Sequence, residues 1–293
     1  MGSALVSAVV DGFLTGTVYA LMAAGLTLIF GVMDIINVAQ GILVVLGSYL
    51  SYVLASHFGI DLFVGLLVTI PCLFLIGIAV EWAFMRRIPG RDKTAMSILV
   101  TYAVALIMIG ALNEIFGLNY VQLQAWYVTK TLHFAGIYLP YIYLFGFGLA
   151  VVLLAALYLL LYRTRFGASV RASLQDRNAA RLIGIDVARV ATVSFGIGVA
   201  MTAAGGMLFG ATNAFNANSS EDLISRLLAI VILGGLGSIG GALGAAVFML
   251  MVEDVVSVAW SPVWAPAVFF IVLVLVLSIR PQGLWGRVSV RAQ

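Results

Sequence analysis

Polar residues interrupt a long apolar region at Gly31-Val32-Met33-Asp34-Ile35-Ile36-Asn37-Val38-Ala39-Gln40-Gly41. Asp34, Asn37 and Gln40 are the polar members, and glycines flank the stretch from Gly25 to Gly47. Irregular backbone is tolerated at membrane depth where it lines a cavity inside the protein, and broken helices of this kind often carry transport sites. The stretch therefore predicts a broken helix within a membrane, and the alternative is a plain cytoplasmic turn between two helices.

The composition of the whole chain indicates a protein that lies in lipid. Its 293 residues are 63% hydrophobic and only 9% charged, and the mean hydropathy is +1.15. A soluble domain normally carries about 25% charged residues. The net charge of +3 does not indicate nucleic-acid binding, because the basic residues lie in short clusters between apolar runs. We therefore expect an integral membrane protein without a soluble domain.

Apolar runs define the membrane-crossing segments. A helix that crosses the hydrocarbon needs about 20 mostly apolar residues. Runs near this length cover residues 5–30, 41–56, 62–85, 95–116, 138–162, 190–212, 241–258 and 263–279. A shorter run, 223–236, is a ninth crossing or a half-helix. Because unsatisfied backbone groups are costly in lipid, the sequence predicts one all-α polytopic bundle of about eight to nine transmembrane helices with broken or half-helices.

Three clusters of basic residues predict the orientation of the bundle. They comprise Arg86, Arg87, Arg91 and Lys93; Arg163, Arg165, Arg171, Arg177, Arg181 and Arg189; and Arg280, Arg287 and Arg291. Positively charged loops stay in the cytoplasm, so we expect all three on that side. The chain must then cross an even number of times between the second and third clusters, which requires 223–236 to cross. The N-terminus is outside if 5–30 crosses once, and inside if that run bends or re-enters near Gly25–Gly31.

A second unusual region is rich in glycine, at Leu233-Gly234-Gly235-Leu236-Gly237-Ser238-Ile239-Gly240-Gly241-Ala242-Leu243-Gly244. It contains a GxGxxG pattern, but no strand precedes it, so a dinucleotide site is not indicated. Small residues at close spacing let helix backbones approach each other, or let a short helix turn sharply. The sequence therefore favours a structural role for these glycines.

A third region is the cytoplasmic segment 164–186. Gly167 and Gly184 bracket a run of good helix formers. On a helix, Ala172, Ala179, Ala180 and Ile183 share one face, whereas Arg171, Gln175 and Asp176 point elsewhere. An amphipathic cytoplasmic helix can dock in a groove of a partner or lie on the membrane surface. We favour docking on a partner over a solvated loop.

Catalytic chemistry is not indicated anywhere in the chain. His57 and His133 fall in expected outer loops with no set of ligands near them, and the single cysteine, Cys72, excludes an internal disulfide. No phosphate-binding GxxxxGK[ST] loop occurs, so we expect no ATP hydrolysis by this chain itself. No nucleophile and base stand in a defensible arrangement. The sequence predicts neither an enzyme nor a bound metal or cofactor.

Several motifs, in order along the chain, match a known family. They are Tyr19-Ala20-Leu21, Gly25-Leu26-Thr27-Leu28-Ile29-Phe30-Gly31, Ile36-Asn37-Val38-Ala39-Gln40-Gly41, Gly47-Ser48-Tyr49, the residues Gly167, Arg171-Ala172, Gln175-Asp176, Ala179-Ala180 and Leu182-Ile183-Gly184-Ile185, then Leu233 to Gly241, and Arg280-Pro281-Gln282-Gly283-Leu284-Trp285-Gly286. Over essentially its whole length the sequence resembles the branched-chain amino acid permease family of ABC importers. The whole of 1–293 would then be one permease domain.

The resemblance implies partners, a membrane and roles for particular residues. Such a permease pairs with a second related permease, or a copy of itself, in a bacterial-type inner membrane. Two cytoplasmic ATPase subunits use ATP and Mg, and an extracytoplasmic binding protein delivers the substrate. By analogy, the residues that couple to the ATPase are Gly167, Arg171, Ala172, Gln175, Asp176, Ala179, Ala180 and Gly184. The residues that border the translocation path are Asn37, Gln40, Gly41, Gly234, Gly235, Gly237 and Ser238.

At one motif the sequence departs from the family pattern, and this departure leaves more than one class of substrate to consider. Family members commonly read Asn-Phe-Ala-His-Gly where this chain has Asn37-Val38-Ala39-Gln40-Gly41. The expected substrate is a branched-chain amino acid, and the alternatives are urea, short amides or other small organic solutes. A stand-alone channel or secondary transporter is a further alternative. It would need ionisable groups deep in the spans, whereas Glu114 and Glu253 fall near expected ends.

Overall fold

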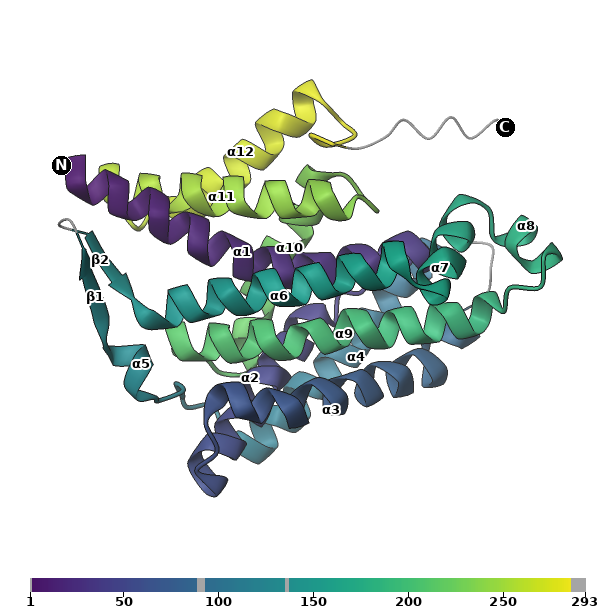
Figure 1. Cartoon of the computed structure of the whole chain (residues 1–293), viewed down its shortest axis with the longest axis horizontal. Helices are drawn as coiled ribbons and strands as arrows, with labels where there is room; N and C mark the ends of the chain where they lie inside the picture. The colour runs from purple at the N-terminus through teal and green to yellow at the C-terminus, as the bar shows by residue number, and fades with distance from the viewer. Residues whose placement is uncertain (1, 89–92, 135–136, 286–293) are drawn as a thin grey trace.

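The computed structural model describes residues 2–88, 93–134 and 137–285, and the architecture within these ranges is almost entirely helical. The longer helices are α1 (Gly2–Met33), α2 (Gln40–Phe58), α3 (Leu62–Ala83), α4 (Lys93–Phe116), α6 (Tyr141–Arg163), α9 (Val187–Thr212), α10 (Ser220–Gly234), α11 (Ile239–Ala259) and α12 (Ala265–Ile279) (Figure 1). The short elements are η1 (Met85–Arg87), α5 (Trp126–Thr129), β1 (Thr131–Phe134), β2 (Ile137–Pro140), α7 (Arg165–Gln175), α8 (Arg177–Leu182) and η3 (Ala217–Ser219).

The expected membrane architecture is confirmed. Among the described residues, seven helices are long and apolar enough to cross a membrane: α1, α2, α3, α4, α6, α9 and α11. The apolar helix α12 and the helix α10 have 15 residues each. The chain is therefore an all-α multi-pass membrane protein.

One boundary differs from the expectation, because residues 137–140 form β2 and α6 starts only at Tyr141. Pro140 fixes its own backbone and lacks an N–H group, which favours a helix start directly after it.

Helices α1 and α9 form the centre of the bundle. In both, 78% of the most apolar stretch is buried, against 22% in α6. Their backbones touch where Gly25 meets Gly198, since a Cβ atom at Gly198 would lie 2.6 Å from the Gly25 carbonyl oxygen. On another face, α1 packs closely on α11, where a Cβ atom at Gly16 would lie 2.7 Å from the Val247 Cα. Small residues thus allow three helices to pack with their backbones in contact.

The two ends of the bundle carry different structures. Helices α7 and α8 lie at one end, whereas α5 and the antiparallel β1–β2 hairpin lie at the other (Figure 1). The basic clusters predict that α7 and α8 lie on the cytoplasmic side, so this end is called the cytoplasmic end and the hairpin end the outer end. Helix α1 runs unbroken through Gly25–Gly31 from the outer end to the cytoplasmic end, and the prediction therefore puts its first turn outside. Of the basic residues named above, Arg91, Arg287 and Arg291 lie outside the described residues, as does Gly286 of the last family motif.

The chain returns from the outer end through residues 213–219 and then α10, which begins inside the bundle and ends at the cytoplasmic end. The segment before it pairs with the loop after α4, through hydrogen bonds between Phe215 and Val121. The turn after it reaches the end of α1, because a Cβ atom at Gly31 would lie 3.8 Å from Gly237 Cα and 3.0 Å from the Leu174 side chain of α7. The chain thus returns to the cytoplasmic end as the charge pattern requires, but α10 is not among the helices long enough to cross a membrane alone, so a full crossing by 223–236 stays a prediction.

The glycine-rich region forms the tight turn between α10 and α11. Gly235 and Gly237 have φ values of 94° and 82°, a region that other residues rarely adopt. A Cβ atom at Gly234 would lie 2.5 Å from the Ala242 backbone nitrogen, so the two helices meet without side chains between them. Ser238 accepts a hydrogen bond from the Gly241 N–H at 3.2 Å and caps α11. The structural role expected for this region is confirmed.

Two halves of the chain repeat one pattern in opposite directions. Phe30-Gly31-x-x-Asp34-x-x-Asn37 ends α1, and Phe209-Gly210-x-x-Asn213-x-x-Asn216 ends α9. After each motif the chain leaves the helix, turns back and starts a new helix, α2 or α10. Helices α1 and α9 run antiparallel (Figure 1). Inverted repeats with broken helices are typical of transporter folds.

Candidate functional site

The first break, residues 34–39, threads back into the bundle beside α4. Hydroxyl groups of α4 satisfy its backbone: Thr94 donates to the Asp34 carbonyl at 2.9 Å, and Ser97 accepts from the Ile36 N–H at 3.2 Å. Further along, Thr101 accepts from the Val38 N–H at 3.0 Å. Non-helical backbone at this depth is stable only with such partners.

The first break ends deep in the protein. The Asn37 amide donates to the Gln40 side-chain oxygen at 2.9 Å, and the Gln40 amide donates to the Gly198 carbonyl at 3.2 Å, at the crossing of α1 and α9. Asn37 and Gln40 are both fully buried. The broken helix is therefore confirmed over the plain cytoplasmic turn, although its first residue, Asp34, is at the cytoplasmic surface.

The second break, residues 213–219, lies at the outer end and is built in the same way. Phe215 exchanges two backbone hydrogen bonds with Val121, at 2.9 and 2.8 Å. Asn216 occupies the place of Asn37: its side chain accepts from the Ser219 N–H at 3.1 Å and donates to the Leu118 carbonyl at 3.3 Å. The Asn216 side chain thus caps the start of the next helical turn, whereas Asn37 accepts from the Gln40 N–H only through its backbone carbonyl.

The two breaks touch each other. A Cβ atom at Gly41, the second residue of α2, would clash with the Ser220 carbonyl oxygen and would lie 2.9 Å from the Ile224 Cβ. The first turns of α2 and α10 are therefore in direct contact. Here, within the part of the chain that the structure describes, the Asn37 Oδ1 and Ser220 Oγ atoms are buried and have no hydrogen-bond partner. Such orphaned groups destabilise the arrangement around them.

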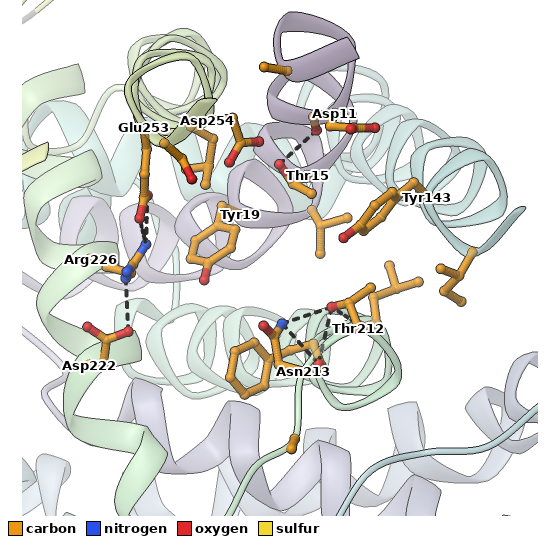
Figure 2. Close-up of a pocket in the computed structure, with 18 of the residues that line it drawn as sticks. Asp11, Thr15, Tyr19, Tyr143, Thr212, Asn213, Asp222, Arg226, Glu253 and Asp254 are labelled. Atoms are coloured by element: carbon orange, nitrogen blue, oxygen red, sulfur yellow. Dashed lines mark hydrogen bonds and ion pairs between the residues drawn. The ribbon is translucent and has the colours of Figure 1, made fainter. Parts of the chain in front are cut away.

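A cavity of about 1030 Å³ opens beside the second break (Figure 2). It is lined by the outer half of α1, the first turn of α6, the end of α9, the start of α10 and the end of α11. From the second break, Asn213, Asn218 and Ser219 reach its wall. All these parts lie towards the end of the bundle opposite α7 and α8, so the cavity is on the outer side.

The cavity is acidic. Its described lining contains four carboxylates and one guanidinium, a formal charge of −3. The carboxylates belong to Asp11, Asp222, Glu253 and Asp254, and the guanidinium to Arg226 (Figure 2). Coulomb attraction across such a low-dielectric wall favours ligands with a positive group.

One ion pair fixes the geometry of the cavity wall. Arg226 contacts both carboxylate oxygens of Glu253 at 2.6 Å and Asp222 at 2.9 Å. The side chains of Arg226 and Glu253 are only 14% and 11% exposed. The Nη1 atom makes both contacts to Glu253 and Nε makes the contact to Asp222, so the largely buried guanidinium bridges two carboxylates and holds α10 against α11. Tyr19 and Tyr143 point into that space from α1 and α6 (Figure 2).

The seven residues expected to border a translocation path lie elsewhere. Asn37, Gln40 and Gly41 belong to the first break, and the set Gly234, Gly235, Gly237 and Ser238 forms the α10–α11 turn. None of them lines the outer cavity. They lie between the cavity and the cytoplasm, so their place on a path through the bundle stays a prediction.

The segment 164–186 forms two helices rather than the single amphipathic helix expected. Asp176 has an extended backbone and ends α7, and its side chain accepts from the N–H groups of Asn178 and Ala179 at 2.7 and 3.1 Å. An aspartate at this position caps the start of α8 and so separates the helices. The expected common face is absent as a result, since Ala180 is buried while Ile183 is 74% exposed.

Other coupling candidates hold α7 onto the end of α6. The Arg171 guanidinium donates to the Leu161 carbonyl and lies 5.2 Å from the centre of the Tyr162 ring. Gly167 packs on the Leu161 backbone, where no side chain fits. Gln175 is the last residue of α7, Ala172 lies within it and Gly184 ends the segment with a φ of 85°. The expected residues thus lie together at the cytoplasmic end.

Sequence reasoning missed the acidic cavity and the second break. Asp11 is far in the sequence from Asp222, Glu253 and Asp254, and only the fold brings α1 to the wall that α10 and α11 form. The repeated Phe-Gly-x-x-Asp/Asn-x-x-Asn motif was a usable signal, because it sets Asn213 and Asn216 in register with Asp34 and Asn37.

Apolar membrane helices, two inverted breaks and a helical cytoplasmic segment define a multi-pass membrane permease. A family model described as "Branched-chain amino acid transport system / permease component" matches residues 8–277, so the chain belongs to this family.

Named relatives match over most of their length. The chain is 28% identical to the "Probable branched-chain amino acid transport permease protein LivH" of Methanocaldococcus jannaschii, over 91% of this chain and 88% of the relative. It is 26% identical to the "High-affinity branched-chain amino acid transport system permease protein BraD" of Pseudomonas aeruginosa, over 96% and 95%. It is 27% identical to the corresponding protein LivH of Escherichia coli, over 96% and 95%.

Proposed function

We propose that this chain is the membrane-spanning subunit of an ATP-driven importer for branched-chain amino acids, located in a bacterial-type inner membrane. The names of the relatives and of the family support this substrate class over urea and short amides. The observation that carries the proposal is the placement of an outer cavity and a cytoplasmic docking segment at opposite ends of one bundle. A permease needs both, because substrate arrives on one side and ATP is consumed on the other.

The outer cavity is where the substrate enters in this proposal. Its volume of about 1030 Å³ exceeds that of a single amino acid. An amino acid is a zwitterion, so in this proposal its ammonium group faces the wall with a formal charge of −3 and its carboxylate faces away from that wall. Selection among amino acids falls mainly to an extracytoplasmic binding protein, which docks at the end formed by α5 and the β1–β2 hairpin. Alternating access then closes this side and opens the cytoplasmic side.

The cytoplasmic segment is where ATPase subunits dock in this proposal. Its tip exposes apolar side chains that water does not favour: Leu182 is 88% and Ile183 is 74% exposed. Exposed apolar groups at the end of a short polar helix are typical of a protein contact. Two ATPase subunits, one for this chain and one for a second related permease or a copy of this chain, would bind ATP and Mg.

Purification tests the proposed assembly. We expect the chain, isolated from its native membrane in mild detergent, to bring an ATPase pair and a second permease with it. A homo-oligomer that is reproducibly free of ATPase under these conditions would instead support a stand-alone channel.

The double variant Arg171→Ala/Asp176→Ala is expected to uncouple ATP hydrolysis from import. Loss of the Arg171 contacts frees α7 from α6, and loss of the Asp176 cap costs α8 about 1 kcal/mol. The docked segment then moves without moving the bundle. Import and ATP hydrolysis are measured in the same proteoliposomes, and a parental ratio of import to hydrolysis would contradict this role.

A further inference from the structure

Arg177, the first residue of α8, ties the docking segment directly to the end of α1. Its Nη2 atom lies 2.6 Å from the Val32 carbonyl oxygen and 3.3 Å from Asp34 Oδ2. The Arg177 side chain is 28% exposed, so it is largely covered by these neighbours. Hydrogen bonds with a charged donor are among the strongest in proteins.

The position of this guanidinium suits the end of a helix. The last carbonyl groups of a helix lack partners within it and carry partial negative charge. Arg177 satisfies one of them, at Val32. Asp34 follows with a φ of 52°, a left-handed conformation that ends α1 and that aspartate tolerates better than most residues. Arg177 therefore fixes both the last turn of α1 and the first residue of the break.

From Asp34 a continuous series of contacts reaches the outer cavity. The first break is held on α4 by Thr94, Ser97 and Thr101, and ends at Gln40. Directly after it, Gly41 packs on the Ser220 backbone. The second break, which precedes Ser220, contributes Asn213, Asn218 and Ser219 to the cavity wall. The first break cannot shift at one end without moving at the other, because hydrogen bonds hold it at both Asp34 and Gln40.

The junction of the two breaks is also suited to rearrangement. The buried Asn37 Oδ1 and Ser220 Oγ atoms, which lack partners among the described residues, reduce the cost of leaving this conformation. Elements that move in transport need such marginal stability.

We propose that Arg177 is the positioning residue that transmits movement of the ATPase-docking segment to the first break, and through the Gly41–Ser220 contact to the outer cavity. This inference rests on the proposed importer function. When the ATPase subunits shift α8, Arg177 pulls on Val32 and Asp34, and the two breaks change position together. Docking itself does not depend on Arg177, because its guanidinium is directed at α1 and the exposed apolar tip is formed by Leu182 and Ile183.

The test compares Arg177→Gln with Arg189→Gln in the complete complex. Arg189 is exposed at the start of α9 and is a matched control for the loss of one cytoplasmic charge. The readouts are the amount of ATPase subunits that purify with the chain, and radiolabelled leucine imported per ATP hydrolysed in proteoliposomes with the binding protein added. For Arg177→Gln we expect unchanged ATPase binding and an import-to-hydrolysis ratio lowered by about tenfold or more. Arg189→Gln keeps both values.

Two further variants sharpen the result. Arg177→Lys keeps the charge but loses the planar fork, so an intermediate ratio is expected. Asp34→Asn keeps a residue that tolerates the left-handed backbone and removes the charge that pairs with Arg177, so it too lowers the ratio. If the Arg177→Gln chain itself does not accumulate in the membrane, Asp34→Asn replaces it in the test, and a parental ratio in that variant overturns the inference.

A parental ratio in Arg177→Gln, or a loss of import that follows a loss of bound ATPase, likewise overturns it. If the parent complex shows no ATP-dependent import, the proposed function fails as well, and the two failures are thereby distinguished.

Discussion

Replacing Gly198 by leucine is expected to prevent the folded protein from accumulating in the membrane. A Cβ atom at Gly198 would lie 2.6 Å from the Gly25 carbonyl oxygen and 2.7 Å from the Ile29 side chain. The α1 backbone cannot yield there, because it is packed on α11 from another side. Overpacking by a single methylene costs about 1–3 kcal/mol, and a leucine adds several. The Gly198 carbonyl would also lose the Gln40 hydrogen bond that anchors the first break.

The measurement is the amount of monodisperse protein after extraction in mild detergent, compared at equal expression. Gly148→Leu is the matched control, because Gly148 also lies in a membrane helix, α6, and an added Cβ atom there meets nothing within 4 Å. Near-parental amounts of the Gly198→Leu protein would show that α1 and α9 do not cross with their backbones in contact.

The second large effect is expected from breaking the buried ion pair in the cavity wall. Arg226→Met leaves the Glu253 carboxylate buried, with Asp254 beside it and without its guanidinium partner. Removing one member of a buried pair destabilises a protein by about 3–5 kcal/mol, because a charge without compensation stays in a low-dielectric environment. Thermal unfolding of the purified protein measures this loss.

The double variant Arg226→Met/Glu253→Met is the control for this prediction. Replacing both members by apolar residues of similar size is often neutral, so most of the lost stability should return. Equal destabilisation by the single and double variants would contradict the view that an uncompensated buried charge causes the loss. Asp222→Asn should have a small effect by comparison, because the Asp222 side chain is 64% exposed.

The sequence specifies the helices of this protein better than their arrangement. Apolar runs such as 62–85 and 95–116 predict α3 and α4 to within a few residues, because a helix in lipid must be apolar over its whole length. The break at 34–39 was also predictable, since Asp34, Asn37 and Gln40 cannot be left without partners at membrane depth. What the sequence does not contain is the identity of those partners on α4 and α9.

The sequence does not predict the outer cavity, because the cavity depends on how distant helices pack together. Asp11 on α1 is far in the sequence from Asp222 on α10 and Asp254 on α11, and each alone is typical of an ordinary polar residue near a helix end. Only packing of α1 on α11, and of α11 on α10, brings them to one wall. The division of segment 164–186 into two helices was not predicted, for a local reason. Asp176 was assigned to a helix face, whereas its side chain caps α8 and interrupts the helix.

ATP-dependent uptake is the measurement that decides whether this chain belongs to an importer of branched-chain amino acids. The complex that purifies with this chain is reconstituted in proteoliposomes with its binding protein, and radiolabelled leucine is supplied on the binding-protein side. We expect accumulation of leucine that requires ATP, is abolished by an ATPase subunit unable to hydrolyse it, and is reduced by unlabelled isoleucine or valine but not by urea or acetamide. Leucine equilibration without ATP, or accumulation reduced by urea and acetamide alone, would contradict it.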